Sequence, residues 1–101
     1  MPTPKLSDAD ITAALAELPG WKLEAGMLQK TYKHDTFPEA IVFVNAVAHL
    51  AELANHHPDV DIRYSNITLR LTTHDSGGIT AKDVELAKEV EAVRKKMGVP
   101  T

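Results

Sequence analysis

The sequence contains no cysteine, so it forms no disulfide and offers no thiolate as nucleophile or metal ligand. It also lacks an excess of positive charge: 11 Lys and Arg face 14 Asp and Glu, for a net charge of -3. This balance argues against binding to a nucleic-acid backbone. The opening residues 1–6 lack the apolar run of a signal peptide, and no stretch approaches the length of a membrane span. We therefore expect a cytoplasmic protein with neither a nucleic-acid partner nor a membrane.

What the sequence does contain fits one folded domain. Its 101 residues are 44% hydrophobic and 25% charged, which is ordinary for a globular chain. A chain of this length buries roughly two-thirds of its unfolded surface, enough for one core. We predict a single domain over residues 1–101. Five histidines are its main chemical resource.

Capping patterns and periodicity predict the order of the elements. Ser7, Thr36 and Thr80 are each followed three residues later by an acidic residue, a pattern typical of a helix start. Between these helices, alternating apolar residues predict strands over 21–24, 27–33, 60–64 and 67–72, the last two with one buried face formed by their apolar residues. Turns are predicted at residues 25–26 and 65–66. The predicted fold is α+β with the order α-β-β-α-β-β-α, in which helices pack on a four-stranded antiparallel sheet.

The last two helices carry further expectations. The central helix should run from about residue 37 to about residue 55 and end because of Pro58. In the last helix, residues 84, 87, 90 and 97 should face the core. The basic run of residues 94–96 suits the negative end of that helix. His34, which precedes the central helix, should be solvated.

The central helix is unusually apolar. Residues 40–51 include only two polar side chains, Asn45 and His49, so apolar residues point in more than one direction. One interpretation buries this helix on both sides within a monomer. We prefer a second, in which one face packs on the sheet and another on a neighbouring subunit, as in a homodimer or homotetramer.

The few polar residues of this helix are aligned. Asn45, His49, Glu52 and His56 follow the spacing i, i+4, i+7, i+11, so they lie along one line. Glu52, one turn before His56, is placed to hold that imidazole. His56 and the adjacent His57 can exchange protons near neutral pH. The alternative is a pair of solvated residues at a helix end.

A metal site is disfavoured by the pattern. No HExxH or similar ligand spacing occurs, and adjacent histidines are an uncommon chelating pair. Ser76, followed by two glycines, lacks the strand–turn–helix setting of a nucleophilic serine. We therefore predict no metal site.

A spaced set of residues resembles a known family. The pattern Glu52-x3-His56-His57-Pro58-x5-Tyr64-x9-His74-x8-Asp83 is similar to the signature of the pterin-4a-carbinolamine dehydratases. Trp21 at a strand start, residues 43–45 and residues 67–69 before Thr73 and His74 also fit that family's layout, so the resemblance covers nearly the whole chain.

The resemblance implies a hydro-lyase. Its substrate would be 4a-hydroxytetrahydropterin, which loses water to give quinonoid dihydropterin in tetrahydrobiopterin recycling. Because the pterin is the substrate, the resemblance implies no metal and no organic cofactor. The family's three functional histidines correspond to His56, His57 and His74. His56 and His74 would transfer protons by acid/base catalysis, in either assignment, and His57 would position the ring and hydroxyl. The substrate-binding residues implied are Glu52, which would orient His56, and Pro58, Thr73, Asp75, Ser76 and Asp83. Asp83 is equally explained as a helix cap.

The resemblance departs at Val60, where many members carry an aromatic residue. A stacking contact with one face of the pterin is therefore not expected at that position. Relatives in animals also serve as dimerisation cofactors of a transcription factor through the central helix. A non-catalytic interaction protein is thus the alternative function, although the complete histidine set favours an enzyme.

Overall fold

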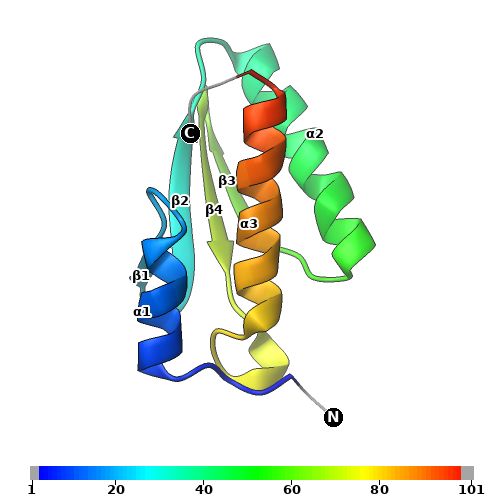
Figure 1. Cartoon of the computed structure of the whole chain (residues 1–101). Coiled ribbons are helices and arrows are strands. Elements are labelled where there is room, and N and C mark those ends of the chain that lie inside the picture. The colour runs from blue at the N-terminus through cyan, green and yellow to red at the C-terminus, as the bar shows by residue number, and fades with distance from the viewer. Residues whose placement is uncertain (1–2, 99–101) are drawn as a thin grey trace.

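The computed structural model describes residues 3–98 and has the predicted element order (Figure 1). The elements are α1 (Asp8–Ala16), β1 (Lys22–Glu24), β2 (Met27–Lys33), α2 (Phe37–Ala54), β3 (Asp59–Arg63), β4 (Asn66–Leu71), the 3-10 turn η1 (His74–Ser76) and α3 (Ala81–Lys96). The strands form one antiparallel sheet in the order β1-β2-β4-β3. The predicted fold class is confirmed.

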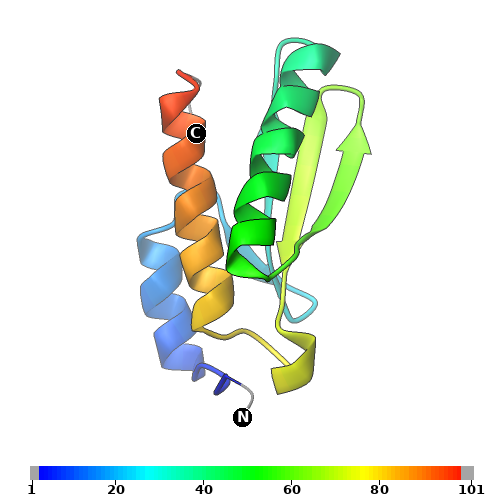
Figure 2. The ribbon, with the colours of Figure 1, turned by 90° about the vertical axis from the view of Figure 1, so that its right-hand side faces the viewer.

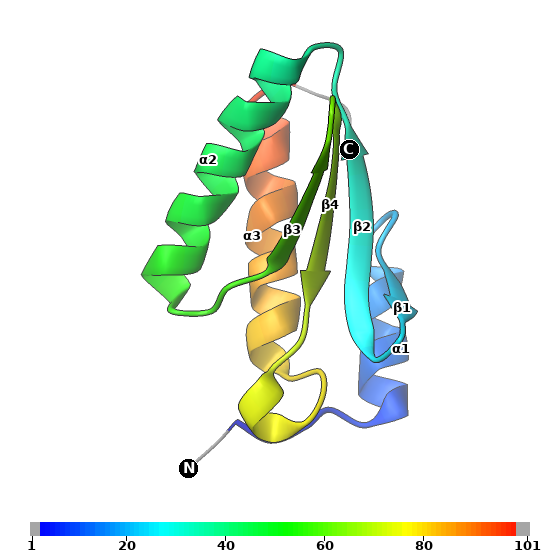
Figure 3. The same ribbon diagram turned by 180° about the vertical axis from the view of Figure 1, so that it is seen from behind.

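The molecule has two layers, with the helices on one face of the sheet (Figures 1 and 3). Helix α2 packs against α3 and β4. The core lies between the layers and is built from apolar residues of every helix and of β2 and β4: Ile11, Leu18, Trp21, Leu28, Tyr32, Ala40, Phe43, Val47, Ile67, Leu69, Leu71, Ile79, Leu86, Ala87 and Val90. The opposite face of the sheet carries polar pairs such as Thr31 and Thr68, whose hydroxyls are hydrogen-bonded at 2.7 Å. One face of the sheet is thus buried and the other is exposed to solvent, as an alternating strand pattern requires.

The helix starts follow the predicted caps. The side chain of Ser7 accepts a hydrogen bond from the backbone N–H of Asp10, and that of Thr36 accepts one from the backbone N–H of Glu39. Thr80 forms a full capping box with Asp83. Helix α2 ends where predicted, near residue 55, but the cause differs from the predicted one. Asn55 adopts the left-handed conformation with φ 49°, and the backbone N–H of His56 donates to the carbonyl of Ala51 at 3.1 Å. The helix therefore ends at an αL cap, three residues ahead of Pro58.

The hairpin that joins β3 to β4 turns one residue earlier than predicted. Arg63 pairs with Asn66, so the turn residues are Tyr64, with φ 52°, and Ser65. The expected burial of β3 is also wrong. Val60 pairs with the buried Leu69 on the helix-facing side, yet it is 41% exposed. The reason is its position at the edge of the sheet, where the helical layer does not cover it.

The prediction for His34 is wrong. It was expected in solvent, but its ring is buried and packs against Phe43 at a tilt, with ring centroids 5.1 Å apart. Arg94, which was expected to suit the negative end of the last helix, is buried against the faces of Tyr32 and Phe43, at 5.1 Å from each ring centroid. In the same helix Leu86 is fully buried, whereas Val84 and Met97 are half-buried. The inner stripe of α3 therefore includes a cation held by aromatic faces.

Helix α2 is longer and more apolar than a core requires. Its 18 residues reach a mean hydropathy of 1.3, so by length and composition alone it would qualify as a membrane span. Ala40, Phe43, Val47 and Ala51 bury one side in the core. Val42 and the 75%-exposed Leu53 leave apolar surface on another side. Part of the apolar surface of α2 is therefore not buried within the chain.

Candidate active site

Three of the five histidines meet at one pocket. It has a volume of about 340 Å³ and lies where the end of α2, the 3-10 turn η1 and the start of α3 come together (Figure 2). Its lining residues are Asn55, His56, His57, Thr72, Thr73, His74, Asp75 and Lys82. The volume lies at the lower end of the range for small-molecule sites. Folding thus brings His74 beside the two adjacent histidines at the end of α2.

His56 is anchored by a buried carboxylate. Its Nε2 lies 2.5 Å from Oδ1 of Asp83, whose side chain is fully buried, while the His56 side chain keeps 11% of its surface exposed. Because the carboxylate accepts the proton on Nε2, the other ring nitrogen, Nδ1, is left for an external partner. This arrangement resembles the orienting acid of a catalytic dyad.

Asp83 also holds the start of α3. Its second oxygen, Oδ2, accepts the backbone N–H of Thr80 at 2.9 Å and the hydroxyl of Thr73 at 2.8 Å. The helix-cap explanation is therefore correct, but the same carboxylate also binds His56. A fully buried side chain does not reach a substrate, so the geometry differs from the substrate-binding role that the resemblance implies.

The partner predicted for Glu52 is wrong. Its carboxylate lies 3.0 Å from Nε2 of His57 rather than beside His56. The αL residue Asn55 reverses the chain after α2, which turns His56 inward and leaves His57 outside. The side chains of Glu52 and His57 are 80% and 57% exposed, so their pairing orients His57 but adds little stability.

The remaining predicted site residues divide into two groups. His74 and Asp75, in η1, line the pocket and are exposed. Within residues 3–98 the His74 ring makes no side-chain hydrogen bond, so both of its nitrogens are open. Ser76 points elsewhere, because its hydroxyl donates to the carbonyl of Thr3. Pro58 is half-buried and does not line the pocket.

Three lining residues were not predicted from the sequence. Asn55 and Thr72 adjoin predicted residues in the chain, and Lys82 precedes Asp83 in the first turn of α3. In the sequence, Lys82 could have been found from its position next to Asp83, a residue of the motif. The line of polar residues on α2 does not continue into the site, because Asn45 and His49 are exposed and do not line the pocket.

No cluster of three or more His, Asp and Glu side chains within residues 3–98 is arranged to hold a metal ion. The groups that converge on the pocket are imidazoles, a carboxylate, an amide, hydroxyls and an ammonium group. Such a set can donate and accept protons and can bind the polar edge of a heterocycle.

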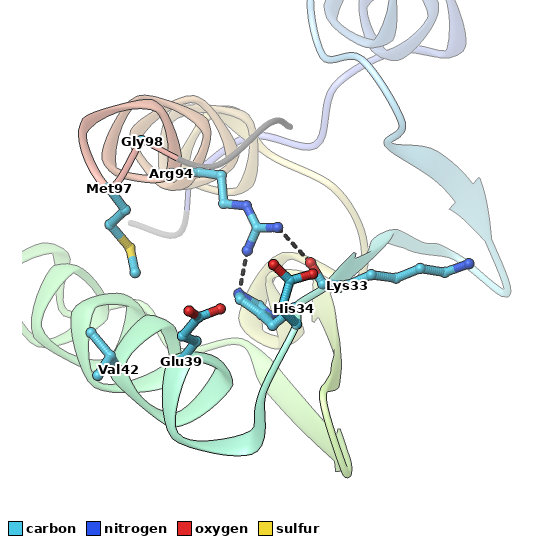
Figure 4. Close-up of a pocket in the computed structure, with 8 residues that line it drawn as sticks. Lys33, His34, Glu39, Val42, Arg94, Met97 and Gly98 are labelled. Carbon is cyan, nitrogen blue, oxygen red and sulfur yellow. Dashed lines mark hydrogen bonds between the residues drawn. The ribbon is translucent and has the colours of Figure 1, made fainter.

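A larger cavity, of about 620 Å³, lies elsewhere, between the start of α2 and the end of α3 (Figure 4). His34 and Arg94 form its wall. The ring Nδ1 of His34 lies 3.2 Å from the carbonyl of Ser65, and Nε2 faces Nη1 of Arg94. Nδ1 therefore carries the proton and Nε2 accepts one from the guanidinium, which requires a neutral imidazole. The contact between His34 and Arg94 at the wall of this cavity therefore has a structural role.

We expect this contact to make folding sensitive to acid. Burial and the Arg94 charge lower the pKa of His34, although Ser65, Glu39 and Asp35 act in the opposite direction. Since the pKa is about 6.5 in the unfolded chain, the contribution of His34 to stability is complete above that pH and is lost as the pH falls through the folded-state pKa. The melting temperature should therefore fall less between about pH 7.5 and pH 5.5 in His34→Gln than in the unsubstituted protein.

His49→Gln is the matched control, because His49 is exposed on α2 and lies outside both cavities. It should keep the pH dependence of the unsubstituted protein. An NMR titration adds a direct measurement, in which the pKa of the His34 ring should lie below the ordinary histidine value of about 6.5. Equal pH dependence in His34→Gln, together with titration of the His34 ring at its ordinary value, would contradict the prediction.

Comparison with known proteins gives a consistent result. Residues 4–93 match the family model described as pterin 4 alpha carbinolamine dehydratase. Curated relatives named "Putative pterin-4-alpha-carbinolamine dehydratase" include one from Chloroflexus aurantiacus that is 50% identical, covering 89% of this chain and 97% of that protein. Another, from Roseiflexus sp., is 49% identical and covers 88% of this chain and 96% of that protein.

Solved structures share the fold. A protein from Brucella melitensis, described as a transcriptional coactivator/pterin dehydratase, superposes with a TM-score of 0.85 at 27% identity, covering 88% of this chain and 97% of that one. A pterin dehydratase-like protein identified as a RuBisCO assembly factor superposes with a TM-score of 0.59 at 20% identity, covering 72% and 84%. The second likeness concerns the fold alone.

Proposed function

The chain belongs to the pterin 4 alpha carbinolamine dehydratase family, a family of hydro-lyases, and from this premise we propose that it removes water from 4a-hydroxytetrahydropterin by histidine acid/base catalysis. The observation that carries the proposal is the meeting of His56, His57 and His74 at one pocket. The product would be quinonoid dihydropterin, and the setting would be tetrahydrobiopterin recycling in the cytoplasm.

The reaction needs two proton transfers at one ring. A base takes a proton from a ring N–H, and the freed electron pair forms a C=N bond as the C4a–oxygen bond breaks. An acid protonates the departing hydroxyl, which leaves as water. His56, through Nδ1, and His74 are the proposed pair. Their settings differ: Asp83 holds one ring, whereas the other is open to solvent and can exchange its proton with water.

The other lining residues would hold the substrate. His57, oriented by Glu52, would position the pterin ring and its hydroxyl. Asn55, Asp75 and Lys82 supply an amide, a carboxylate and an ammonium group for the polar edge of the ring. Since Val60 replaces the aromatic residue of many members, the pterin face on that side would lack a stacking partner. Substrate orientation therefore falls to the polar groups.

We expect the protein to form a homodimer or homotetramer. Large apolar side chains are exposed along α2 and the edge strand: Phe37, Val42, Leu53, Val60, Ile62 and Tyr64. The rings of Phe37 and Tyr64 stack, with centroids 6.4 Å apart, so the two elements share one apolar surface. An exposed surface of this kind is typical of an interface between copies.

Size-exclusion chromatography with light scattering checks this expectation. The protein should elute well above 11.0 kDa at micromolar concentration, and Leu53→Lys or Ile62→Lys should lower its mass. Thr31→Lys, on the opposite face of the sheet, is the control and should leave the mass unchanged. A clean monomer of the unsubstituted chain contradicts the expectation.

The same apolar surface favours one alternative, a non-catalytic interaction protein. The Brucella structure is described as a coactivator as well as a dehydratase. An interaction role would leave His56, His57 and His74 expendable. Activity and binding can therefore be separated by variants of the pocket and of α2.

Turnover of enzymatically generated 4a-hydroxytetrahydropterin tests the proposed function. Catalysed loss of the carbinolamine, followed by its ultraviolet absorbance against the spontaneous rate, is the expected result. A rate equal to the spontaneous one, with folded protein, would overturn the proposal.

A further inference from the structure

Thr73 precedes His74 and lines the same pocket as His56, but its hydroxyl is used within the protein. Only 7% of the residue is exposed. Its Oγ1 lies 2.8 Å from Oδ2 of Asp83 and 2.8 Å from Oγ1 of Thr80. The sequence implied a lining residue for the pterin. Its hydroxyl instead belongs to a buried network behind the pocket.

The direction of each hydrogen bond in this network follows from the donor inventory. A carboxylate only accepts, so the Thr73 hydroxyl proton goes to Asp83. With that proton used, Thr73 can only accept from the hydroxyl of Thr80, whose oxygen in turn accepts the backbone N–H of Lys82 at 3.2 Å. The chain of donors therefore runs from Thr80 to Thr73 to Asp83, and every polar group has a partner.

Thr73 is linked to both histidines proposed for proton transfer, to one through its side chain and to the other through its backbone. Through Asp83, the hydroxyl acts on the His56 ring, which binds the other carboxylate oxygen. Through the backbone, Thr73 starts the turn that carries His74: its N–H donates to the carbonyl of Gly78 at 3.1 Å, and its carbonyl accepts from Ser76 at 3.0 Å. One residue thus joins two catalytic elements that are far apart in the chain.

We propose that Thr73 is a positioning residue for the dehydration, which sets the His56 ring against His74 through its hydrogen bond to Asp83. The inference rests on the proposed function. It adds that the threonine hydroxyl, rather than the bulk of the side chain, maintains the geometry of the pair. Small errors in the placement of acid and base groups have large effects on rate, so loss of the hydroxyl should lower kcat more than it weakens binding.

The test compares two variants at this position with one control. Thr73→Val keeps the shape and removes the hydroxyl, and its kcat should fall by about tenfold or more while KM changes by less than about threefold. Thr73→Ser restores the hydroxyl and should return kcat to within about twofold of the unsubstituted protein. Thr68→Val removes a threonine hydroxyl on the opposite face of the sheet and should leave kcat unchanged.

An NMR measurement covers the case in which Thr73→Val does not fold. In the unsubstituted protein and in Thr73→Ser, the His56 ring should show a hydrogen-bonded Nε2–H resonance at neutral pH. Its absence would overturn the proposal, as would an unchanged kcat in folded Thr73→Val. A protein without dehydratase activity that retains this resonance would instead refute the proposed function and leave the network intact.

Discussion

Replacing His56 or His74 by alanine should lower the rate of dehydration by at least about 100-fold, the usual scale for the loss of a general acid or base. Each substitution removes one of the two rings proposed for proton transfer, which line the pocket from separate segments of the chain. The proton transfer that each ring supplies has no substitute nearby, because His57 is paired with Glu52. Steady-state kinetics on the carbinolamine, with the spontaneous rate subtracted, gives the measurement.

The matched control is His49→Ala. It removes the same ring from an exposed site on α2 that does not line the pocket, so activity should stay at that of the unsubstituted protein. Circular dichroism should show that all three variants remain folded. If His56→Ala and His74→Ala are both folded and retain the full rate, the assigned site is wrong. A loss in His49→Ala as large as theirs would show that the assay responds to stability.

Asp83→Asn should lower both activity and stability. The carboxylate accepts from His56 on one oxygen and from Thr73 and Thr80 on the other, whereas an amide has only one accepting oxygen. Either His56 or the two donors from Thr73 and Thr80 must therefore lose their acceptor, at a position that is fully buried. Leaving a buried donor unpaired costs about 1–3 kcal/mol of stability. Misorientation of the His56 ring should lower kcat by about 10- to 100-fold.

The control for Asp83→Asn is Asp10→Asn, which changes the same residue type in the first turn of α1 without a histidine partner. Urea titration should show a smaller loss of stability for Asp10→Asn, and its kcat should be unchanged. If Asp83→Asn loses stability but keeps kcat, the carboxylate is only a helix cap. The hydrogen bond between Asp83 and His56 would then make no contribution to catalysis.

Much of the fold could be predicted from local chemistry. The caps at Ser7, Thr36 and Thr80 predicted the helix starts, because a short polar side chain satisfies the free N–H groups wherever the helix packs. The alternation of apolar and polar residues predicted the strands and their antiparallel pairing, because it marks the buried face of each strand. The motif around His56 and His57 pointed to the site and its family without any tertiary information.

Errors arose where a residue's environment is decided by distant segments. His34 and Arg94 look like surface residues in the sequence, yet they meet across 60 positions and are buried together. Val60 alternates like a core residue but lies on an edge strand that the helices leave uncovered. Periodicity reports which side of an element is apolar, but it does not report what covers that side.

The sequence by itself determined the element order, the apolar central helix and the histidines proposed to carry the chemistry. Only the tertiary structure decided which carboxylate serves which imidazole. Glu52 is one helical turn from His56 in the chain, but the αL cap at Asn55 turns His56 towards α3, where Asp83 lies. The physical reason is that a hydrogen bond depends on distance in space. A single left-handed residue and the packing of α2 on α3 changed that distance in a way that no local spacing records.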